Sequence, residues 1–207
     1  AYATLFRKSD IILFLDFDGT LAAIVDHYKS ATILQESKML LRKIAKLPGC
    51  SITIVSGRAL ADVKKRVGLK SITYVGNHGL EIEGPGVKNT FFVKISDRTR
   101  FKLIKHDLMT HIGHIKGVLI EDKGLTLTCH YRLVKRSALS LFKKKLLECL
   151  SPYLKKNEVS VNEGKKVFES NPKVKWDKGK AVLLLIDHFQ RKSLSKKIFP
   201  VFIGDDV

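Results

Sequence analysis

The chain has 207 residues, of which 44% are hydrophobic and 28% are charged, proportions that exclude a disordered tail, a collagen or a coiled coil. Its formal net charge of +18 favours encounters with nucleic acid, anionic lipid or phosphorylated ligands. The basic residues are 29 Lys and 9 Arg, whereas bidentate recognition of bases and phosphates favours Arg. We therefore interpret the charge as a solvated, Lys-rich surface and expect no specific nucleic-acid partner.

Two absences in the sequence bear on its environment. The longest strongly apolar run, Ile11 to Leu15, is too short to cross a membrane, and no leader pattern precedes a cleavage site. The three cysteines are widely spaced and form no Cys-x-x-Cys motif, so they indicate neither a disulfide framework nor a zinc site. We expect a soluble, cytoplasmic monomer without a membrane partner.

The first part of the chain alternates strands and helices. The continuous apolar run at 11–15 predicts a strand buried on both faces, and apolar residues between 34 and 47 at helical spacing predict a helix. A strand at 51–55, a helix at 59–67 and a strand at 71–75 follow. Short loops between such elements predict right-handed crossovers and a parallel sheet with helices on both faces, so the fold class is α/β.

The alternation changes after Gly84-Pro85-Gly86. Helices are predicted at 97–111 and 137–150, and each precedes a pair of strands, at 116–121 and 125–131 and at 158–161 and 166–169. This order favours an antiparallel sheet with helices on one face. A helix at 178–190 and a strand at 198–203 then return to the first pattern. We predict one domain from residues 1–96 plus 172–207, with residues 97–171 inserted as a second domain.

Polar residues follow the first buried strand, where parallel sheets bind ligands beyond the carboxyl ends of their strands. Asp16 and Asp18 are two residues apart in an extended segment, so their carboxylates face one side. Two such anions require a hard divalent cation or a shared proton. Gly19 allows a sharp turn and Thr20 adds a hydroxyl donor, which together predict a seat for phosphate. The alternative is a simple Asp-Gly turn that closes the strand.

Two further strand ends carry candidate residues. Ser56, Gly57 and Arg58 follow the second strand and suit an oxyanion contact at a helix N-terminus, although Ser56 could equally be an N-cap. Asn77 and His78 follow the third strand, and a lone histidine there is often structural.

The last segment adds acidic residues and a lysine. Asp205 and Asp206 follow the final strand and would complete an all-oxygen Mg²⁺ site with Asp16 and Asp18 if that strand lies beside the first. Lys178 opens the last helix, where its ammonium group could balance a phosphoryl dianion. The alternative for Asp205 and Asp206 is a solvated turn, and the alternative for Lys178 is a solvent-exposed first turn of the helix.

Together these segments resemble, in order and spacing, the four motifs of the haloacid dehalogenase superfamily of phosphatases. The resemblance implies a Rossmann-like parallel-sheet core with an inserted α/β cap domain. More narrowly, the chain resembles the trehalose-6-phosphate phosphatases. It departs from their pattern in two places. In that family a Thr-Asp-Glu-Asp stretch, a helix and a strand usually follow the paired Asp, and an Arg-Pro often lies near Glu169, but this sequence contains neither the stretch nor the Arg-Pro. The strings that carry this narrower resemblance are Gly76–Glu81, Glu121–Gly124, His130–Arg132 and Gly164–Glu169.

The resemblance implies a Mg²⁺-dependent phosphatase of trehalose biosynthesis that hydrolyses trehalose 6-phosphate. Asp16 would attack phosphorus to form an aspartyl-phosphate, and Asp18 would protonate the leaving sugar and then deprotonate water. The remaining implied roles are phosphate binding by Thr20, Ser56, Gly57 and Lys178; metal binding by Asp16, Asp18, Asp205 and Asp206; and substrate binding by Arg58, Asn77, His78, Glu121, Lys123, Arg132, Lys165 and Glu169.

Three alternatives stay open. The enzyme could act on another sugar phosphate, such as a glycosyl-3-phosphoglycerate, because the core motifs do not identify the leaving group. The chain could be a non-catalytic basic module that binds polyanions. Asp16 could also be stably phosphorylated, as in a receiver or a mutase.

Overall fold

The structure is a computed structural model, and it describes residues 9–25, 27–91, 95–193 and 197–205. The chain divides into two compact units, unit 1 (Ala1–Phe92 with Trp176–Val207) and unit 2 (Val93–Lys175), so unit 2 is inserted in the chain of unit 1. These junctions differ by a few residues from the predicted ones, and the role of unit 2 as a cap stays a prediction.

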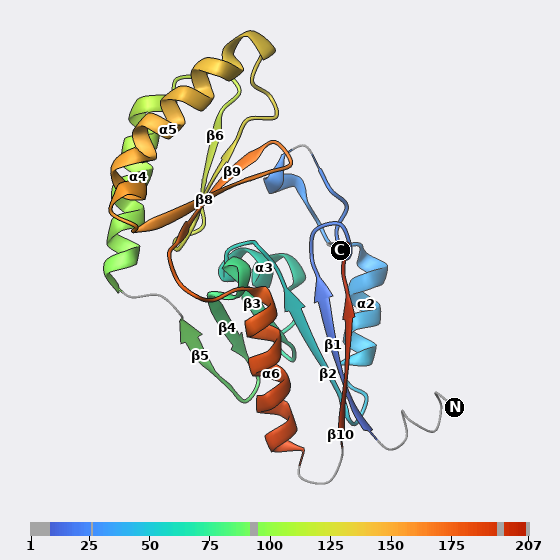
Figure 1. The fold of residues 1–207 in the computed structure, drawn as a ribbon. Coiled ribbons are helices and arrows are strands. Elements are labelled where there is room, and N and C mark those ends of the chain that lie inside the picture. Colours follow the sequence, from blue (N-terminus) through green and yellow to red (C-terminus); the bar gives the residue numbers. More distant parts are fainter. Residues whose placement is uncertain (1–8, 26, 92–94, 194–196, 206–207) are drawn as a thin grey trace. The chain divides into compact units, whose positions relative to one another are not determined.

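Unit 1 contains a six-stranded sheet in the order β10-β1-β2-β3-β4-β5 (Figure 1). The first four strands of this order are parallel, which confirms the α/β class. The strands are β1 (Ser9–Asp16), β2 (Cys50–Val55), β3 (Thr73–Gly76), β4 (Glu81–Gly84), β5 (Val87–Phe91) and β10 (Lys197–Ile203).

Helices cover both faces of this sheet. The helices of unit 1 are α2 (Gln35–Ile44), α3 (Leu60–Val67) and α6 (Lys178–Lys192), with short 3-10 helices η1 (Tyr28–Ser30) and η2 (Asn77–Gly79). Successive residues of a strand point to opposite faces. Leu15 of β1 accordingly packs in the cluster that contains α2 and α3, whereas Phe14 packs with Leu185 of α6. Of the apolar residues at helical spacing in 34–47, Leu41 is the one that is fully buried.

The antiparallel strands β4 and β5 were not predicted from the sequence. We read Gly84-Pro85-Gly86 as the point where the pattern changes, but these residues lie at the turn that joins β4 to β5. The reason is local: the four residues of β4 include one apolar side chain, Ile82, so no hydrophobic period could be recognised.

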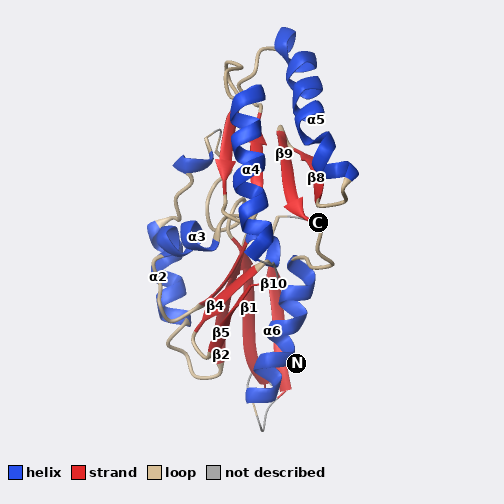
Figure 2. Cartoon of the chain, turned by 90° about the vertical axis from the view of Figure 1, so that its left-hand side faces the viewer, coloured by secondary structure: helices blue, strands red, loops and turns tan. Residues whose placement is uncertain are grey.

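Unit 2 is a four-stranded antiparallel sheet in the order β6-β7-β9-β8, with α4 and α5 packed on one face, as predicted (Figure 2). No helix among the described residues combines the length and apolar composition that a membrane crossing requires. The elements of unit 2 are α4 (Ile95–Ile112), β6 (Leu119–Asp122), β7 (Leu127–His130), η3 (Arg136–Ala138), α5 (Leu139–Lys155), β8 (Val159–Gly164) and β9 (Val167–Pro172).

Candidate active site

Four parallel strands of unit 1 end at the same edge of the sheet, and a polar segment follows each of them. Leu15 of β1 pairs with Ile203 of β10, and Asp16 pairs with Val55 of β2. Val55 pairs in turn with Val75 of β3. The residues that follow the four strands therefore lie along one edge, as the parallel order predicts.

Asp16 is the last residue of β1, and it is only 5% exposed. Its Oδ1 accepts a hydrogen bond from the backbone amide of Phe17 at 2.8 Å, and its Oδ2 lies 3.6 Å from the ammonium nitrogen of Lys178. A buried carboxylate is stable only when it is paired or hydrogen-bonded, and both conditions are met here. The edge therefore presents a fixed anion beside a cation.

The position of Lys178 depends on a close backbone contact at Gly79. Trp176 donates its indole N–H to the carbonyl oxygen of Gly79 at 2.7 Å, and Asp177 caps α6 by accepting the amide of Lys180 at 2.8 Å. Gly79 has a φ of +101°, and a Cβ built there would lie 2.6 Å from the carbonyl oxygen of Asp177. Sequence reasoning missed Gly79, although its place directly after Asn77-His78 was a signal.

Asp18 and Arg58 bind each other, whereas the sequence analysis assigned them separate roles. The guanidinium donates to both carboxylate oxygens of Asp18, at 2.7 Å from Nη2 and 2.8 Å from Nε. It also donates to Asp62 and to the carbonyl oxygen of Tyr28. Burial opposes the charge of Arg58, but the hydrogen bonds and charges of Asp18 and Asp62 outweigh it and raise the pKa of the guanidinium. In this structure the Asp18 carboxylate is therefore held by Arg58 in the loop that follows β1.

Replacing Arg58 by Lys should destabilise unit 1. A lysine ammonium cannot reach Asp18, Asp62 and the Tyr28 carbonyl together, so we expect the free energy of unfolding to fall by about 2 kcal/mol. The loss stays moderate because the Asp18 side chain is 41% exposed and screened by solvent. Arg191→Lys is the matched control, since Arg191 and its partner Asp187 are largely exposed, and it should change stability by less than about 0.5 kcal/mol. Equal effects of the two substitutions in urea unfolding would contradict this account.

Asp62 should make stability depend on pH. Burial acts to raise the pKa of this carboxyl, but hydrogen bonds from Arg66 and Arg58, with their charges, lower it below its usual 3.8. A carboxyl whose pKa is lower in the folded state stabilises the fold above its unfolded pKa, and this contribution is lost as the pH falls through the folded pKa. The difference in unfolding free energy between wild type and Asp62→Asn should therefore shrink as the pH is lowered from about 5 to about 2. A difference that stays constant over this range would count against the ion pairs.

Asp205 lies beside the loop that follows β1. A Cβ built on Gly19 would lie 2.2 Å from Oδ2 of Asp205, and one built on Gly204 would lie 3.4 Å from the Cβ of Asp16. Among the described residues, however, no three His, Cys, Asp or Glu side chains form a cluster suited to a metal. Asp206, which we predicted to support the metal, lies outside the described residues. Asp16, at the end of β1, and Asp205, just beyond the end of β10, are therefore the two predicted metal ligands that lie at the ends of adjacent strands.

The phosphate-seat residues predicted after β1 and β2 lie in tight turns. Thr20 is half-buried in the turn that Gly19 opens with a φ of +81°. The amide of Gly19 donates to the Ala22 carbonyl at 2.8 Å, so this amide is not directed at a ligand. Ser56 is buried, and its Oγ accepts the amide of Arg58 at 3.1 Å, which leaves its proton to donate elsewhere.

The segment after β3 is conformationally strained. Asn77 and His78 have φ values of +47° and +55°, a region that residues other than glycine seldom adopt. Such strain is common at functional sites. The amide of Asn77 donates to the Arg58 carbonyl at 2.7 Å, and a Cβ built on Gly57 would lie 2.5 Å from Cε1 of His78. A side chain at residue 57 would therefore require the imidazole ring of His78 to move.

The predicted substrate residues of unit 2 occupy two places. Glu121 and Glu169 lie on one face of the antiparallel sheet, because each pairs in register with Thr128. The ammonium group of Lys123 lies 3.5 Å from the carboxylate of Glu169. Arg132 and Lys165 are exposed beyond the adjacent ends of β7 and β9.

Sequence reasoning missed His130 as a site residue. Its Nε2 lies 2.8 Å from Oε2 of Glu121. The signal was the period of two along β7, which puts His130 on the same face as Thr128.

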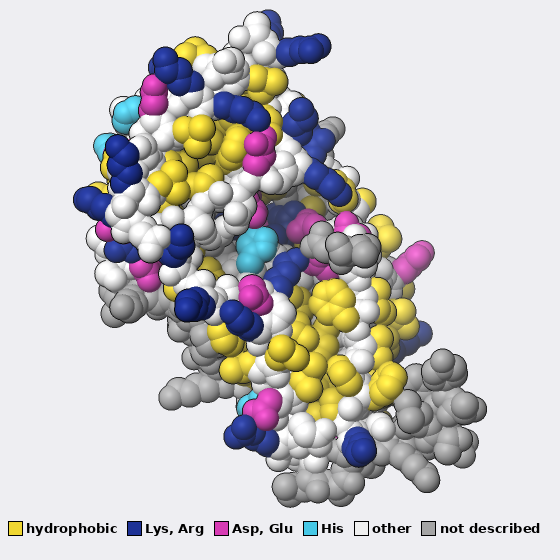
Figure 3. Space-filling model, viewed as in Figure 1, with side chains coloured by type: hydrophobic (Ala, Val, Ile, Leu, Met, Phe, Trp, Pro, Cys, Tyr) yellow, Lys and Arg dark blue, Asp and Glu magenta, His cyan; other side chains and the backbone are white. Residues whose placement is uncertain are grey.

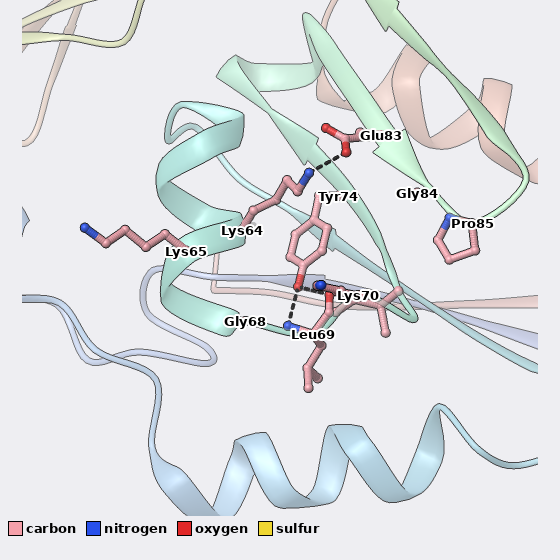
Figure 4. Close-up of a pocket in the computed structure, with 10 residues that line it drawn as sticks. Lys64, Lys65, Gly68, Leu69, Lys70, Tyr74, Glu83, Gly84 and Pro85 are labelled. Carbon is pink, nitrogen blue, oxygen red and sulfur yellow. Dashed lines mark hydrogen bonds and ion pairs between the residues drawn. The ribbon is translucent and has the colours of Figure 1, made fainter.

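A cavity of about 750 Å³ lies elsewhere in unit 1, between the end of α3, the start of β3 and the β4–β5 turn (Figure 4). Tyr74 donates its hydroxyl proton to the Leu69 carbonyl at 2.7 Å, and Lys64 forms an ion pair with Glu83. None of the predicted site residues lines this cavity. It lies at the opposite end of β3 from Asn77, so we do not assign the chemistry to it.

Residues 14–207 match the family model described as Trehalose-phosphatase. The trehalose-phosphate phosphatase of Mycobacterium tuberculosis is 33% identical over 196 residues, covering 94% of this chain and 48% of that protein. That of Mycobacterium leprae is 32% identical over 201 residues, covering 94% and 45%. The chain thus spans about half the length of the curated relatives it matches.

Solved structures agree on the fold. The C-terminal domain of the C. albicans trehalose-6-phosphate phosphatase aligns with a TM-score of 0.79 at 24% identity, covering 98% of this chain and 71% of that one. A haloacid dehalogenase-like hydrolase from B. subtilis aligns with a TM-score of 0.57 at 15% identity, covering 94% and 82%.

Proposed function

The chain belongs to the trehalose-phosphatase family, and from this premise we propose that it hydrolyses trehalose 6-phosphate to trehalose and phosphate. The observation that carries the proposal is the buried carboxylate of Asp16, which lies 3.6 Å from the ammonium group of Lys178 at the edge where four parallel strands end. An ionised carboxylate needs no separate base to become a nucleophile. The cation beside it offsets the repulsion between this carboxylate and an approaching phosphate dianion.

In the first step, an oxygen of Asp16 forms a bond to phosphorus while the bond from phosphorus to the sugar oxygen breaks. Asp18, released from Arg58 and carrying a proton, gives that proton to the leaving sugar oxygen. In the second step, Asp18 takes a proton from water, and the water oxygen displaces Asp16 from phosphorus. Thr20, Ser56, Gly57 and Lys178 hold the phosphate oxygens during both steps.

We also propose that Mg²⁺ binds at this edge, held by Asp16 and Asp205 and completed by Asp18 and Asp206. Carboxylate oxygens on two neighbouring strand ends are the donors that Mg²⁺ prefers, although Asp18 faces Arg58 in this structure. When bound, the ion would supply positive charge that neutralises the phosphoryl oxygens.

The sugar would be recognised by Arg58, Asn77 and His78 of unit 1 and by five residues of unit 2. A disaccharide presents many hydroxyl groups, and carboxylates and ammonium groups that hydrogen-bond them discriminate better than an apolar pocket can. The five residues of unit 2 are Glu121, Lys123, Arg132, Lys165 and Glu169.

The test is a comparison of phosphate release from trehalose 6-phosphate, glucose 6-phosphate and a glycosyl-3-phosphoglycerate, with Mg²⁺ and with a chelator. We expect trehalose 6-phosphate to have the highest kcat/KM and the chelator to remove the activity. Equal rates for trehalose 6-phosphate and glucose 6-phosphate would show that the substrate assignment is wrong. The polyanion-binding alternative would instead use the Lys and Arg side chains at the surface, some of which are visible in Figure 3.

A further inference from the structure

The sheet of unit 2 has one apolar and one polar face, and the polar face carries an ordered row of side chains. Leu127, Cys129 and Phe168 point to the side of α4 and α5 and form the core. On the other side, strand register aligns four residues across all four strands. The row runs Glu121, Thr128, Glu169, Asn162 along the order β6-β7-β9-β8.

His130 lies diagonal to Glu121 on this face. It pairs in register with Leu119, two residues before Glu121, and long side chains on such diagonal positions can touch. The imidazole Nε2 lies 2.8 Å from Oε2 of Glu121, and the two side chains are 20% and 11% exposed. The hydrogen bond is therefore largely shielded from water, which strengthens it.

This hydrogen bond leaves one oxygen of Glu121 for a ligand. Oε1 accepts no hydrogen bond from a described residue, and it is not among the fully buried atoms that lack a partner. The neighbouring hydroxyl of Thr128 is buried and, within the described part of the chain, forms no hydrogen bond that could hold the carboxylate instead. A glutamate side chain has three rotatable bonds, so a fixed partner decides where Oε1 points.

We propose that His130 is a positioning residue for sugar recognition, which holds the Glu121 carboxylate so that Oε1 accepts a hydrogen bond from a hydroxyl of the sugar. The proposal rests on the proposed function. It implies that His130 acts on KM through Glu121 and does not act on the chemical step, because the group that it orients contacts only the sugar.

The experiment compares wild type, His130→Ala, His130→Gln and Glu121→Ala with trehalose 6-phosphate and with p-nitrophenyl phosphate, which has no sugar. His130→Ala should raise KM for trehalose 6-phosphate about tenfold, with kcat changed less than about threefold and no effect on p-nitrophenyl phosphate. Gln retains an N–H donor and should restore most of the loss. His114→Ala, an exposed histidine of unit 2, is the matched control and should behave as wild type.

A double-mutant cycle separates positioning from general damage. Adding His130→Ala to Glu121→Ala should not raise KM further, because the group through which His130 acts is already absent. An unchanged KM in His130→Ala, additive effects in the cycle or no recovery with Gln would each overturn the proposal. Wild type that hydrolyses p-nitrophenyl phosphate but not trehalose 6-phosphate would instead overturn the proposed function. Thermal unfolding of each variant shows whether a higher KM results from misfolding. If His130→Ala misfolds, the KM of His130→Gln tests the proposal.

Discussion

Replacing Asp16 with Asn should lower phosphate release by at least about 10³-fold while the fold persists, because an amide cannot serve as the nucleophile in the proposed double displacement. Asn has nearly the same shape, and its side-chain oxygen can still accept the amide of Phe17. We therefore expect the free energy of unfolding to change by less than about 1 kcal/mol, since the packing around residue 16 is retained. The measurements are steady-state phosphate release and urea unfolding.

Asp187→Asn is the matched control for this substitution. Asp187 is an exposed carboxylate of α6 that pairs with Arg191 in the same unit, so its loss removes one charge without touching the strand ends. Activity should remain within about twofold of wild type. If Asp16→Asn retained more than a tenth of wild-type turnover, the nucleophile would have to be another group, and the aspartyl-phosphate would be excluded.

Replacing Gly79 with Ala should have the largest effect on stability. The residue has a φ of +101°, and the new Cβ would lie 2.6 Å from the carbonyl oxygen of Asp177. Because this oxygen belongs to the backbone, no side-chain rotation can relieve the overlap. Backbone strain and overpacking together should lower the free energy of unfolding by about 3 kcal/mol or more. Because relief of the overlap requires the start of α6 to move, Lys178 should also move away from Asp16, and turnover should fall with stability.

Gly124→Ala separates the two contributions. Gly124 has a φ of +80° in a loop of unit 2, and a Cβ there would meet nothing within 4 Å. This substitution should therefore show only the cost of a positive φ, about 1–2 kcal/mol. Equal losses at Gly79 and Gly124 in denaturant unfolding would mean that the contact between Gly79 and Asp177 is not tight.

Local sequence patterns were sufficient for most of the core of unit 1. The unbroken apolar run before Asp16 predicted a strand buried on both faces, and Phe14 and Leu15, which point to opposite faces, are both buried. The polar residues after it could be identified as a candidate site because parallel strands end at a common edge. These inferences depend on residues close together in the chain, whose side-chain periods reveal which face is buried.

The partners of the site residues were decided only by the tertiary structure. Arg58 binds Asp18 from 40 positions away, His130 reaches Glu121 from the neighbouring strand, and Trp176, just before α6, donates to the Gly79 carbonyl from 97 positions away. Each contact depends on strand order, register and side-chain direction, which arise when distant segments pack together. A charged residue in a sequence has many possible partners of opposite charge, and its nearest one is determined only when the fold brings it within hydrogen-bonding distance.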